Sequence, residues 1–259
     1  MNHSTRHLAC CALLSMGAAH AVSLGNAGYT QNFDSMGSSG TAAPLDWAVL
    51  NGPAGTSNST WTSSIPGTGV AALVLVTAPL TASSAPTATN VNGYNAAASA
   101  GTPVDRVLAT SPTSVSGSAL QLSLSNNTGA ALPGLAIGFD TVRFTAVTTA
   151  NELPGYWLFY SLDGASWSNV AALNPSAATV PNTVGISNTS GSFAFSTPVA
   201  AGATFSLRWV DDNAVQTSPD QIIGLNNVSI SAVPEPETVA LWLAGLGVLL
   251  RLSSNRARD

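Results

Sequence analysis

Apolar and polar side chains alternate along much of the middle of the chain. Leu120, Leu122 and Leu124 alternate with polar residues, and the stretch from Phe205 to Trp209 does the same. A period of two places alternate side chains on opposite faces of a strand, so each segment predicts a half-buried β-strand. The same pattern occurs in three further segments: Ile137–Phe144, Phe193–Phe195 and Ile223–Ile230.

Turn signals separate these segments. Asp163-Gly164 lies between the strand-like runs Tyr156–Leu162 and Ser166–Ala171, which predicts a hairpin. Asn226-Asn227 interrupts the last alternation and predicts a break or bulge there. The apolar run Val70–Val76 is compatible with a buried central strand. Capped helical periodicity is absent, so we expect an all-β fold over residues 22–232, an antiparallel β-sandwich with a jelly-roll-like topology.

The first 21 residues have the features of a secretory signal peptide. Arg6 lies in a short polar segment, the apolar stretch Leu8–Ala19 follows, and Ala19-His20-Ala21 is a small-x-small cleavage pattern. We expect cleavage after Ala21, with Asn26-Ala27 as a second option. The alternative is a buried N-terminal helix.

Residues 233–259 form a second distinct segment. Val233, Pro234, Glu235 and Pro236 begin it, and each proline keeps the preceding residue out of the helical region. The uncharged run Val239–Leu250 predicts a C-terminal transmembrane helix, although about 20 apolar residues normally span a bilayer; a core helix is the alternative. Arginines after an apolar run favour the cytoplasmic side, which places three residues in a cytoplasmic tail: Arg251, Arg256 and Arg258.

This order of Pro-Glu-Pro motif, short apolar helix and arginine-containing tail resembles the PEP-CTERM sorting signal of Gram-negative bacteria. The resemblance implies recognition and processing by an exosortase, a membrane cysteine protease-transpeptidase, and a surface or extracellular destination linked to exopolysaccharide and biofilm matrix. The tail departs from the pattern because it is sparsely basic and ends in Asp259. The segments 29–34, 207–213 and 220–230 also resemble the first and last strands of jelly-roll domains found in such proteins.

The composition excludes several kinds of chemistry. Of 259 residues only 7% are charged, the formal net charge is −5, and all basic residues are arginine. Such a chain lacks the basic surface that binds nucleic acid. Both cysteines and all three histidines lie within the first 20 residues: His3, His7, Cys10, Cys11 and His20. A chain that loses its signal peptide therefore has no thiol nucleophile, histidine base or Cys/His zinc site.

Carboxylates are the remaining chemical groups. Asp211, Asp212, Asn213 and Asp220 form an oxygen-rich cluster close to Asn226-Asn227, if the last two strands pair. Calcium binds six to eight such oxygens, so this cluster is a candidate calcium site; an ordinary polar turn is the alternative. Two carboxylates can also serve a glycosidase. The candidates for that role are Asp34, Asp46, Asp105, Asp140, Glu152, Asp163, Asp211, Asp212 and Asp220.

Aromatic side chains are the other candidate ligand-binding groups, because rings stack on sugar faces. The candidates for an exposed platform are Trp47, Trp61, Tyr94, Tyr156 and Trp167, whereas Trp209 is expected in the core. The segment from Ser161 to Trp167 resembles a shortened Asp-box, which favours a structural hairpin turn.

These features together predict a non-enzymatic, exported cell-surface or matrix protein with a structural or adhesive role. The expected partners are an exosortase, the membrane and exopolysaccharide. A carbohydrate-binding module and a carboxylate-based polysaccharide-degrading enzyme are the alternatives. The expected organisation is a signal peptide at 1–21, the sandwich at 22–232 and the sorting signal at 233–259.

Overall fold

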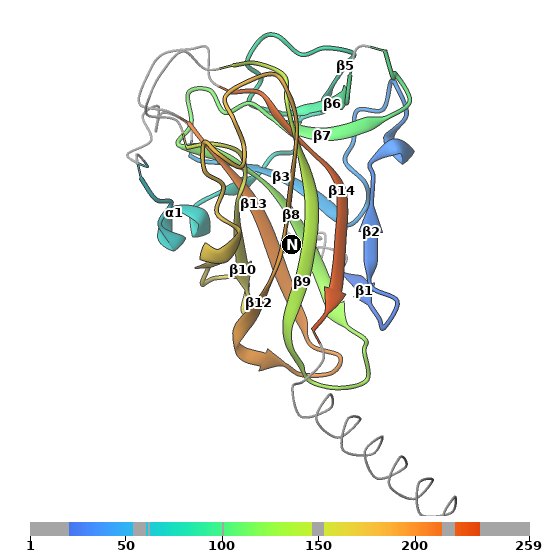
Figure 1. The fold of residues 1–259 in the computed structure, drawn as a ribbon, viewed down its shortest axis with the longest axis vertical. Coiled ribbons are helices and arrows are strands. Elements are labelled where there is room, and N and C mark those ends of the chain that lie inside the picture. Colours follow the sequence, from blue (N-terminus) through green and yellow to red (C-terminus); the bar gives the residue numbers. More distant parts are fainter. Residues whose placement is uncertain are drawn as a thin grey trace, which may run out of the picture.

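Two β-sheets face each other across an apolar interior (Figure 1). The structure is a computed structural model, and it describes residues 21–53, 61, 63–99, 101–146, 153–213 and 221–233. Within these ranges the first strand begins at Val22 and the last ends at Ala232. The predicted all-β sandwich is therefore confirmed.

The first sheet is built around two long antiparallel strands, β8 and β13. Its spatial order is β11 (Ser168–Asn169), β10 (Trp157–Ser161), β13 (Thr204–Asp212), β8 (Gly117–Asn126), β3 (Trp47–Asn51) and β4 (Val74–Leu75). β1 (Val22–Leu24) pairs with β8 in parallel. All the other pairs in this sheet are antiparallel.

The second sheet contains the longest strands of the described chain. Its order is β12 (Gly185–Val199), β9 (Leu132–Arg143), β14 (Ile223–Ala232), β7 (Arg106–Thr110), β6 (Tyr94–Ala97) and β5 (Thr81–Ser83). β2 (Tyr29–Gln31) pairs with β14, and β5 pairs with β6 in parallel. Three short helices connect the strands: η1 (Asp34–Met36), α1 (Gly67–Ala71) and η2 (Ala171–Leu173).

The side chains between the sheets follow the alternation in the sequence. Leu120, Leu122 and Leu124 on β8 are fully buried. Trp209 on β13 lies at the centre of an aromatic group, with its ring centroid 5.2 Å from Trp47 and 6.1 Å from Phe139. Burial of these large side chains is the main source of stability for such a sandwich, at about 1.5–3 kcal/mol for each Leu or Phe.

The prediction of a strand at Val70–Val76 is wrong. Pro66, with φ −77°, precedes helix α1, and the chain forms only the two-residue strand β4 afterwards. Val70 is buried, whereas Val74 and Leu75 on β4 are 58% and 61% exposed. Because an apolar run without alternation fits either a buried helix or a strand, the pattern alone could not decide between them.

The predicted hairpin at Asp163-Gly164 is confirmed. β10 and β11 pair in antiparallel register, with Phe159 opposite Asn169 and Tyr160 opposite Ser168. The bulge predicted at Asn226-Asn227 is also present, because the register of β14 against β9 shifts between Asn226 and Ser229.

The outer faces of the two sheets are covered differently. On the first sheet, α1 and its flanking residues bury a second apolar cluster that includes Trp61, Trp157 and Trp167. On the second sheet, a third cluster around Tyr94 and Val107 covers only the region near β6 and β7. The remaining outer face, over β2, β14, β9 and β12, carries no apolar cluster among the described residues.

Several predictions concern residues outside the described ranges. These are the signal peptide, the transmembrane segment Val239–Leu250 and the arginines of the tail. Among the residues that are described, no helix is long and apolar enough to cross a membrane. The one described residue of the sorting motif is Val233, which directly follows β14 and donates its backbone N–H to the carbonyl of Gly134 at 3.1 Å.

Candidate functional site

The uncovered outer face of the second sheet carries small and polar side chains. On β9, Leu135, Ile137 and Phe139 point into the core, so Ala136, Gly138 and Asp140 point outward by strand alternation. The same rule gives β12 and β14 outward side chains that are mostly serine and asparagine. The outward residues of these two strands include Asn188, Ser190, Ser192, Asn227, Ser229 and Ser231.

The bulge in β14 orients one of these side chains. Asn227 has a positive φ of 47°, a left-handed conformation that asparagine tolerates better than most residues. Its backbone N–H bonds to the side-chain oxygen of Asn226 at 2.8 Å. The extra residue leaves the Asn227 side chain exposed on the outer face, while Val228 returns to the core.

Asp140 lies between two amides from the neighbouring strands. Asn188 Nδ2 on β12 donates to Asp140 Oδ1 at 3.0 Å, and Asn227 Nδ2 on β14 donates to Asp140 Oδ2 at 2.8 Å. Each amide directs an N–H of its Nδ2 to the carboxylate, and its Oδ1 atom can accept a hydrogen bond in turn. We call these three residues the Asn-Asp-Asn cluster.

Two adjoining hollows lie beside this cluster. One, of about 360 Å³, is lined by Asn32 and by residues of β2 and β14 that include Gln31 and Asn227. The other, of about 560 Å³, extends over β9 and β12 and is lined by residues that include Gly138 and Ser190. Both share Thr30 and Ser229 in their linings, so the depression continues across the four strands.

The candidate calcium residues are separated by strand alternation. Asp211 points into the core, where its Oδ2 accepts a hydrogen bond from the Thr110 hydroxyl at 2.6 Å and its Oδ1 accepts one from Gln221 Nε2 at 2.7 Å. Asp212 faces the other side of β13, and its Oδ1 accepts the backbone N–H of Leu153 at 3.1 Å. The two carboxylates are therefore not brought together to face one ion.

Asn213 and Asp220 are the other two residues of the candidate calcium cluster. Asn213 Nδ2 donates to the carbonyl of Val115, and Asp220 lies outside the described residues. Within the described ranges no group of three His, Cys, Asp or Glu side chains is placed to hold a metal. The calcium site remains a prediction from sequence.

Asp211 belongs to a buried hydrogen-bond network between the sheets. The Tyr156 hydroxyl lies 2.9 Å from Thr110 Oγ1 and donates to the carbonyl of Ile223 at 2.8 Å. Burial raises the pKa of Tyr156 well above its ordinary value, and the nearby Asp211 carboxylate raises that pKa further. The network therefore joins β7, β13 and β14 to the residue that directly precedes β10, which is a structural role.

The prediction of an exposed aromatic platform is wrong. All five candidate rings are buried in the sandwich or in the cluster under α1, and Trp167 stacks against Arg208, whose guanidinium carbon lies 4.0 Å from the ring centroid. Burial lowers the pKa of Arg208 to about 10. The buried candidates are Trp47, Trp61, Tyr94, Tyr156 and Trp167.

The segment that resembles an Asp-box forms a turn. Asp163 Oδ1 accepts hydrogen bonds from the Ser161 hydroxyl at 3.0 Å and from the backbone N–H groups of Ala165 and Ser166 at 2.8 and 2.7 Å. These donors lower the pKa of Asp163, with the bond to the Ser166 backbone contributing most. The side chain closes the hairpin, as the structural interpretation predicted.

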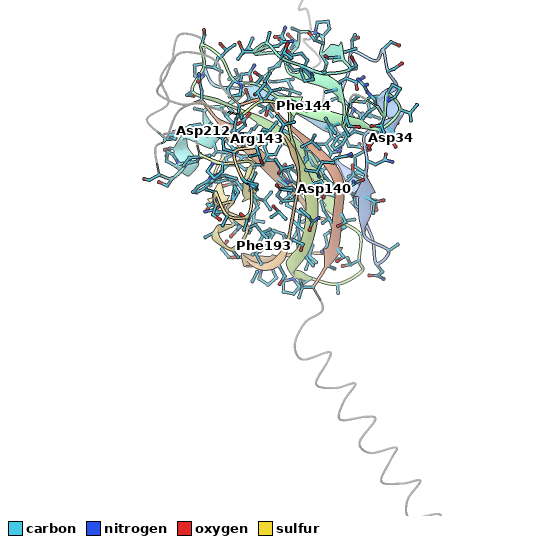
Figure 2. The ribbon with its side chains drawn as sticks, turned by 45° about the horizontal axis from the view of Figure 1, so that its top comes forward. Asp34, Asp140, Arg143, Phe144, Phe193 and Asp212 are labelled. Atoms are coloured by element: carbon cyan, nitrogen blue, oxygen red, sulfur yellow. The ribbon has the colours of Figure 1, made fainter. Side chains whose placement is uncertain are left out.

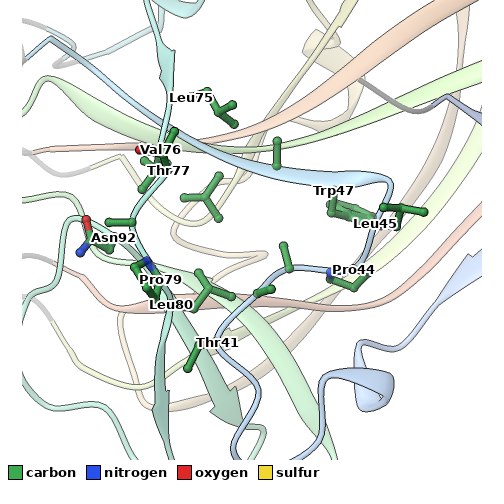
Figure 3. A pocket seen from close by; sticks show the side chains of 15 residues that line it. Thr41, Pro44, Leu45, Trp47, Leu75, Val76, Thr77, Pro79, Leu80 and Asn92 are labelled. Atoms are coloured by element: carbon green, nitrogen blue, oxygen red, sulfur yellow. The ribbon is translucent and has the colours of Figure 1, made fainter. Parts of the chain in front are cut away.

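A further depression of about 510 Å³ lies beside β3 and β4 (Figure 3). Pro44, Leu45 and Trp47 line one side, and Pro79 and Leu80 line the other. Its lining contains no charged residue. It therefore offers apolar contact, but few groups that would orient a polar ligand.

Comparison with known proteins leaves the family open. No family model and no curated protein matches the chain. A 4-O-methyl-alpha-glucuronidase with specificity for decorated arabinogalactans aligns with a TM-score of 0.31 and 12% identity, over 51% of this chain and 15% of that one. A carbohydrate-binding module described for specific mannan recognition aligns with a TM-score of 0.27 and 12% identity, over 50% of this chain and 76% of that one. Similarity of this extent assigns neither a family nor an activity to the chain.

Proposed function

We propose that the sandwich is a non-catalytic carbohydrate-binding domain, and that its binding surface is the polar outer face of the second sheet. The observation that carries the proposal is the Asn-Asp-Asn cluster on three neighbouring strands, beside a continuous depression. Three neighbouring strands span about 10 Å, since adjacent strands lie about 4.8 Å apart. The face can therefore contact an extended chain at several points.

The chemistry of the face fits sugar hydroxyl groups. A hydroxyl both donates and accepts hydrogen bonds, so it can donate to the Asp140 carboxylate or to an amide Oδ1 and accept from a serine or threonine hydroxyl. Hydrogen bonds to a charged group are about twice as strong as neutral ones. Asp140 is held in place by its two amide partners, which limits the conformational entropy lost on binding.

The direct partners of Asp140 favour binding over catalysis. A glycosidase needs two carboxylates on either side of the scissile bond. The neighbours of Asp140 in the cluster are amides, and Asp140 lies well apart from Asp34 and Asp212 (Figure 2). Asp34 accepts the backbone N–H of Arg106 at 2.8 Å, which ties η1 to β7.

The export and sorting predictions form the second part of the proposal. We infer that a secretory signal precedes the sandwich, and that an exosortase processes the segment that begins at Val233. In support, Val233 directly follows the last strand, so the sorting signal would emerge from the folded domain without a linker. A jelly-roll-like topology of the sandwich and a structural or adhesive role in an exopolysaccharide matrix belong to the same proposal.

Binding is tested with the purified full-length chain on a panel of immobilised polysaccharides. At least one polysaccharide should bind, and Asp140→Ala should weaken that binding about 10- to 100-fold, as expected for the loss of a hydrogen bond to a charged group. Asn127→Ala is the matched control, because the exposed Asn127 amide bonds to Ser23 Oγ at 2.8 Å away from the cluster. Absence of binding throughout the panel, or equal affinity of Asp140→Ala and the wild type, would contradict the proposal.

Sorting is tested separately in the producing cell. Replacing Pro234-Glu235-Pro236 with alanines should leave the protein unprocessed and retained in the inner membrane. Normal processing and release of that variant would refute the exosortase assignment while leaving the binding proposal intact.

A further inference from the structure

The second sheet ends in a long open edge. β12 is 15 residues long and pairs with β9 without a register shift from Gly185–Arg143 to Ala194–Gly134. In the described sheet no strand pairs with its other side (Figure 1). Alternate residues of β12 therefore turn their backbone N–H and C=O groups away from β9.

The other sheet edges are short. β11 and β4 at the edges of the first sheet have two residues each, and β5 at the far edge of the second sheet has three. Short edge strands and charged side chains are the usual means by which proteins prevent pairing between edges. β12 lacks both protections, because no residue from Gly185 to Val199 is charged. Pro198 and the irregular register after Ala194 limit pairing only at one end.

We propose that β12 pairs with β12 of a second copy of this chain, antiparallel and around a two-fold axis. This arrangement joins two copies of the second sheet into one continuous sheet. A register centred on Ser190 keeps outward side chains opposite outward side chains, since it sets Asn188 opposite Ser192 and Ile186 opposite Ala194. Ile186 is 60% exposed in the single chain, and this pairing gives it an apolar neighbour.

A second copy fits this edge for two reasons. The outward side chains near the axis are small and uncharged, so two identical strands approach without repulsion or steric conflict. An isologous contact also uses each residue twice and closes after two copies, which avoids open-ended fibres.

Pairing has a consequence for ligand binding, which rests on the proposed function. The two-fold axis of an antiparallel pair is perpendicular to the sheet, so both outer faces lie on the same side. The two Asn-Asp-Asn clusters would then face one polysaccharide chain together. Two linked sites raise the apparent affinity without any new contact.

The pairing is tested without any sugar, so that its failure is distinct from failure of carbohydrate binding. Sedimentation equilibrium of the full-length chain should show a concentration-dependent dimer. Ser190→Glu should weaken association about tenfold or more, because two carboxylates would face each other across the axis at about 5 Å. Ser190→Lys should do the same, and an equal mixture of the two variants should restore dimerisation. Ser38→Glu adds the same charge at an exposed residue outside the sheet and should leave association unchanged.

Three outcomes would overturn the proposal. The wild-type chain could remain monomeric at the highest concentration, or Ser190→Glu could associate as strongly as Ser38→Glu. In the third, both charged variants are monomeric and their mixture does not dimerise, which refutes an axis at Ser190. Circular dichroism of each variant checks that the exposed substitution preserves the fold.

Discussion

Asn227 has two roles: its backbone forms the bulge, and its side chain belongs to the candidate site. Substitutions at this residue can test the two roles separately. The backbone needs φ near 47°, and the side chain donates to Asp140. Replacing Asn227 with Gly, Ala or Val removes the amide in every case. The three variants differ only in how readily the new residue adopts a positive φ.

The expected stabilities follow from the cost of that conformation. A residue with a Cβ in the left-handed region costs about 1–2 kcal/mol, glycine avoids this cost, and a β-branched residue has the greatest steric conflict. Asn227→Gly should therefore be more stable than Asn227→Val by about 1–2 kcal/mol, with Asn227→Ala between them. For a domain of about 200 residues this difference corresponds to roughly 2–8 °C in melting temperature.

The assay combines urea unfolding with polysaccharide binding for all three variants. Stability should follow the order Gly, Ala, Val, whereas binding should fall by a similar factor in each, because each lacks the amide. If Asn227→Val is as stable as Asn227→Gly, the positive φ is not a constraint at this residue. If Asn227→Gly binds as well as the wild type, the amide is not part of the binding surface.

Three further predictions concern the framework. Asn95→Ala should lower the free energy of unfolding by about 3–5 kcal/mol in urea, because its fully buried amide bonds to two loop carbonyls and to Arg106 Nε. Gly117→Ala should cost about 1–3 kcal/mol and alter the near-ultraviolet circular dichroism, since the new Cβ would lie 2.6 Å from the Trp61 ring. Asp163→Ala should have a lower melting temperature than the wild type at neutral pH. Because folding lowers the Asp163 pKa, the difference in melting temperature should shrink as the pH falls below the ordinary value of 3.8. A series of melting curves at decreasing pH measures this.

The elements that the sequence predicted correctly are those where one face of a strand is buried. The alternation from Leu120 to Leu124 and from Phe205 to Trp209 reflects a single core between two sheets, and both segments lie on long strands. Asp163-Gly164 specified its hairpin through local backbone chemistry, and Asn226-Asn227 specified the bulge in the same way. Such signals are local, so they can be interpreted without knowing the fold.

The incorrect predictions concern residues whose burial produces no recognisable pattern in the neighbouring sequence. Val70 and Leu73 are buried three residues apart, a helical spacing hidden within a uniformly apolar run. Trp61 and Trp167 looked like exposed rings because the sequence does not reveal that α1 covers the outer face of the first sheet. A covered outer face produces the same residue types as a core, so the two are indistinguishable along the chain.

The candidate site depends on strand neighbours that the sequence could not supply. Asp140 was one of several candidate carboxylates, but nothing singled it out, and Asn188 lies 48 residues further along the chain. The register of β12 and β14 against β9 is what brings the three cluster residues together. A pattern of period two predicts which residues point outward, whereas the order of strands in a sheet depends on crossovers.

The difference in covering between the two outer faces explains why the second sheet, and not the first, suits a hydrated polymer. Covering a face with a helix requires apolar side chains, as in the cluster under α1, where Trp167 stacks on Arg208. Covering the Asn-Asp-Asn cluster in the same way would remove the Asp140 carboxylate from water, and its two neutral amide partners would not offset the loss of hydration of a charge. A polysaccharide replaces water with hydroxyl groups, so it can cover this face while keeping the carboxylate hydrogen-bonded. Because this face carries few large apolar side chains, it stays open to solvent and suits a ligand that, like water, offers hydroxyl groups.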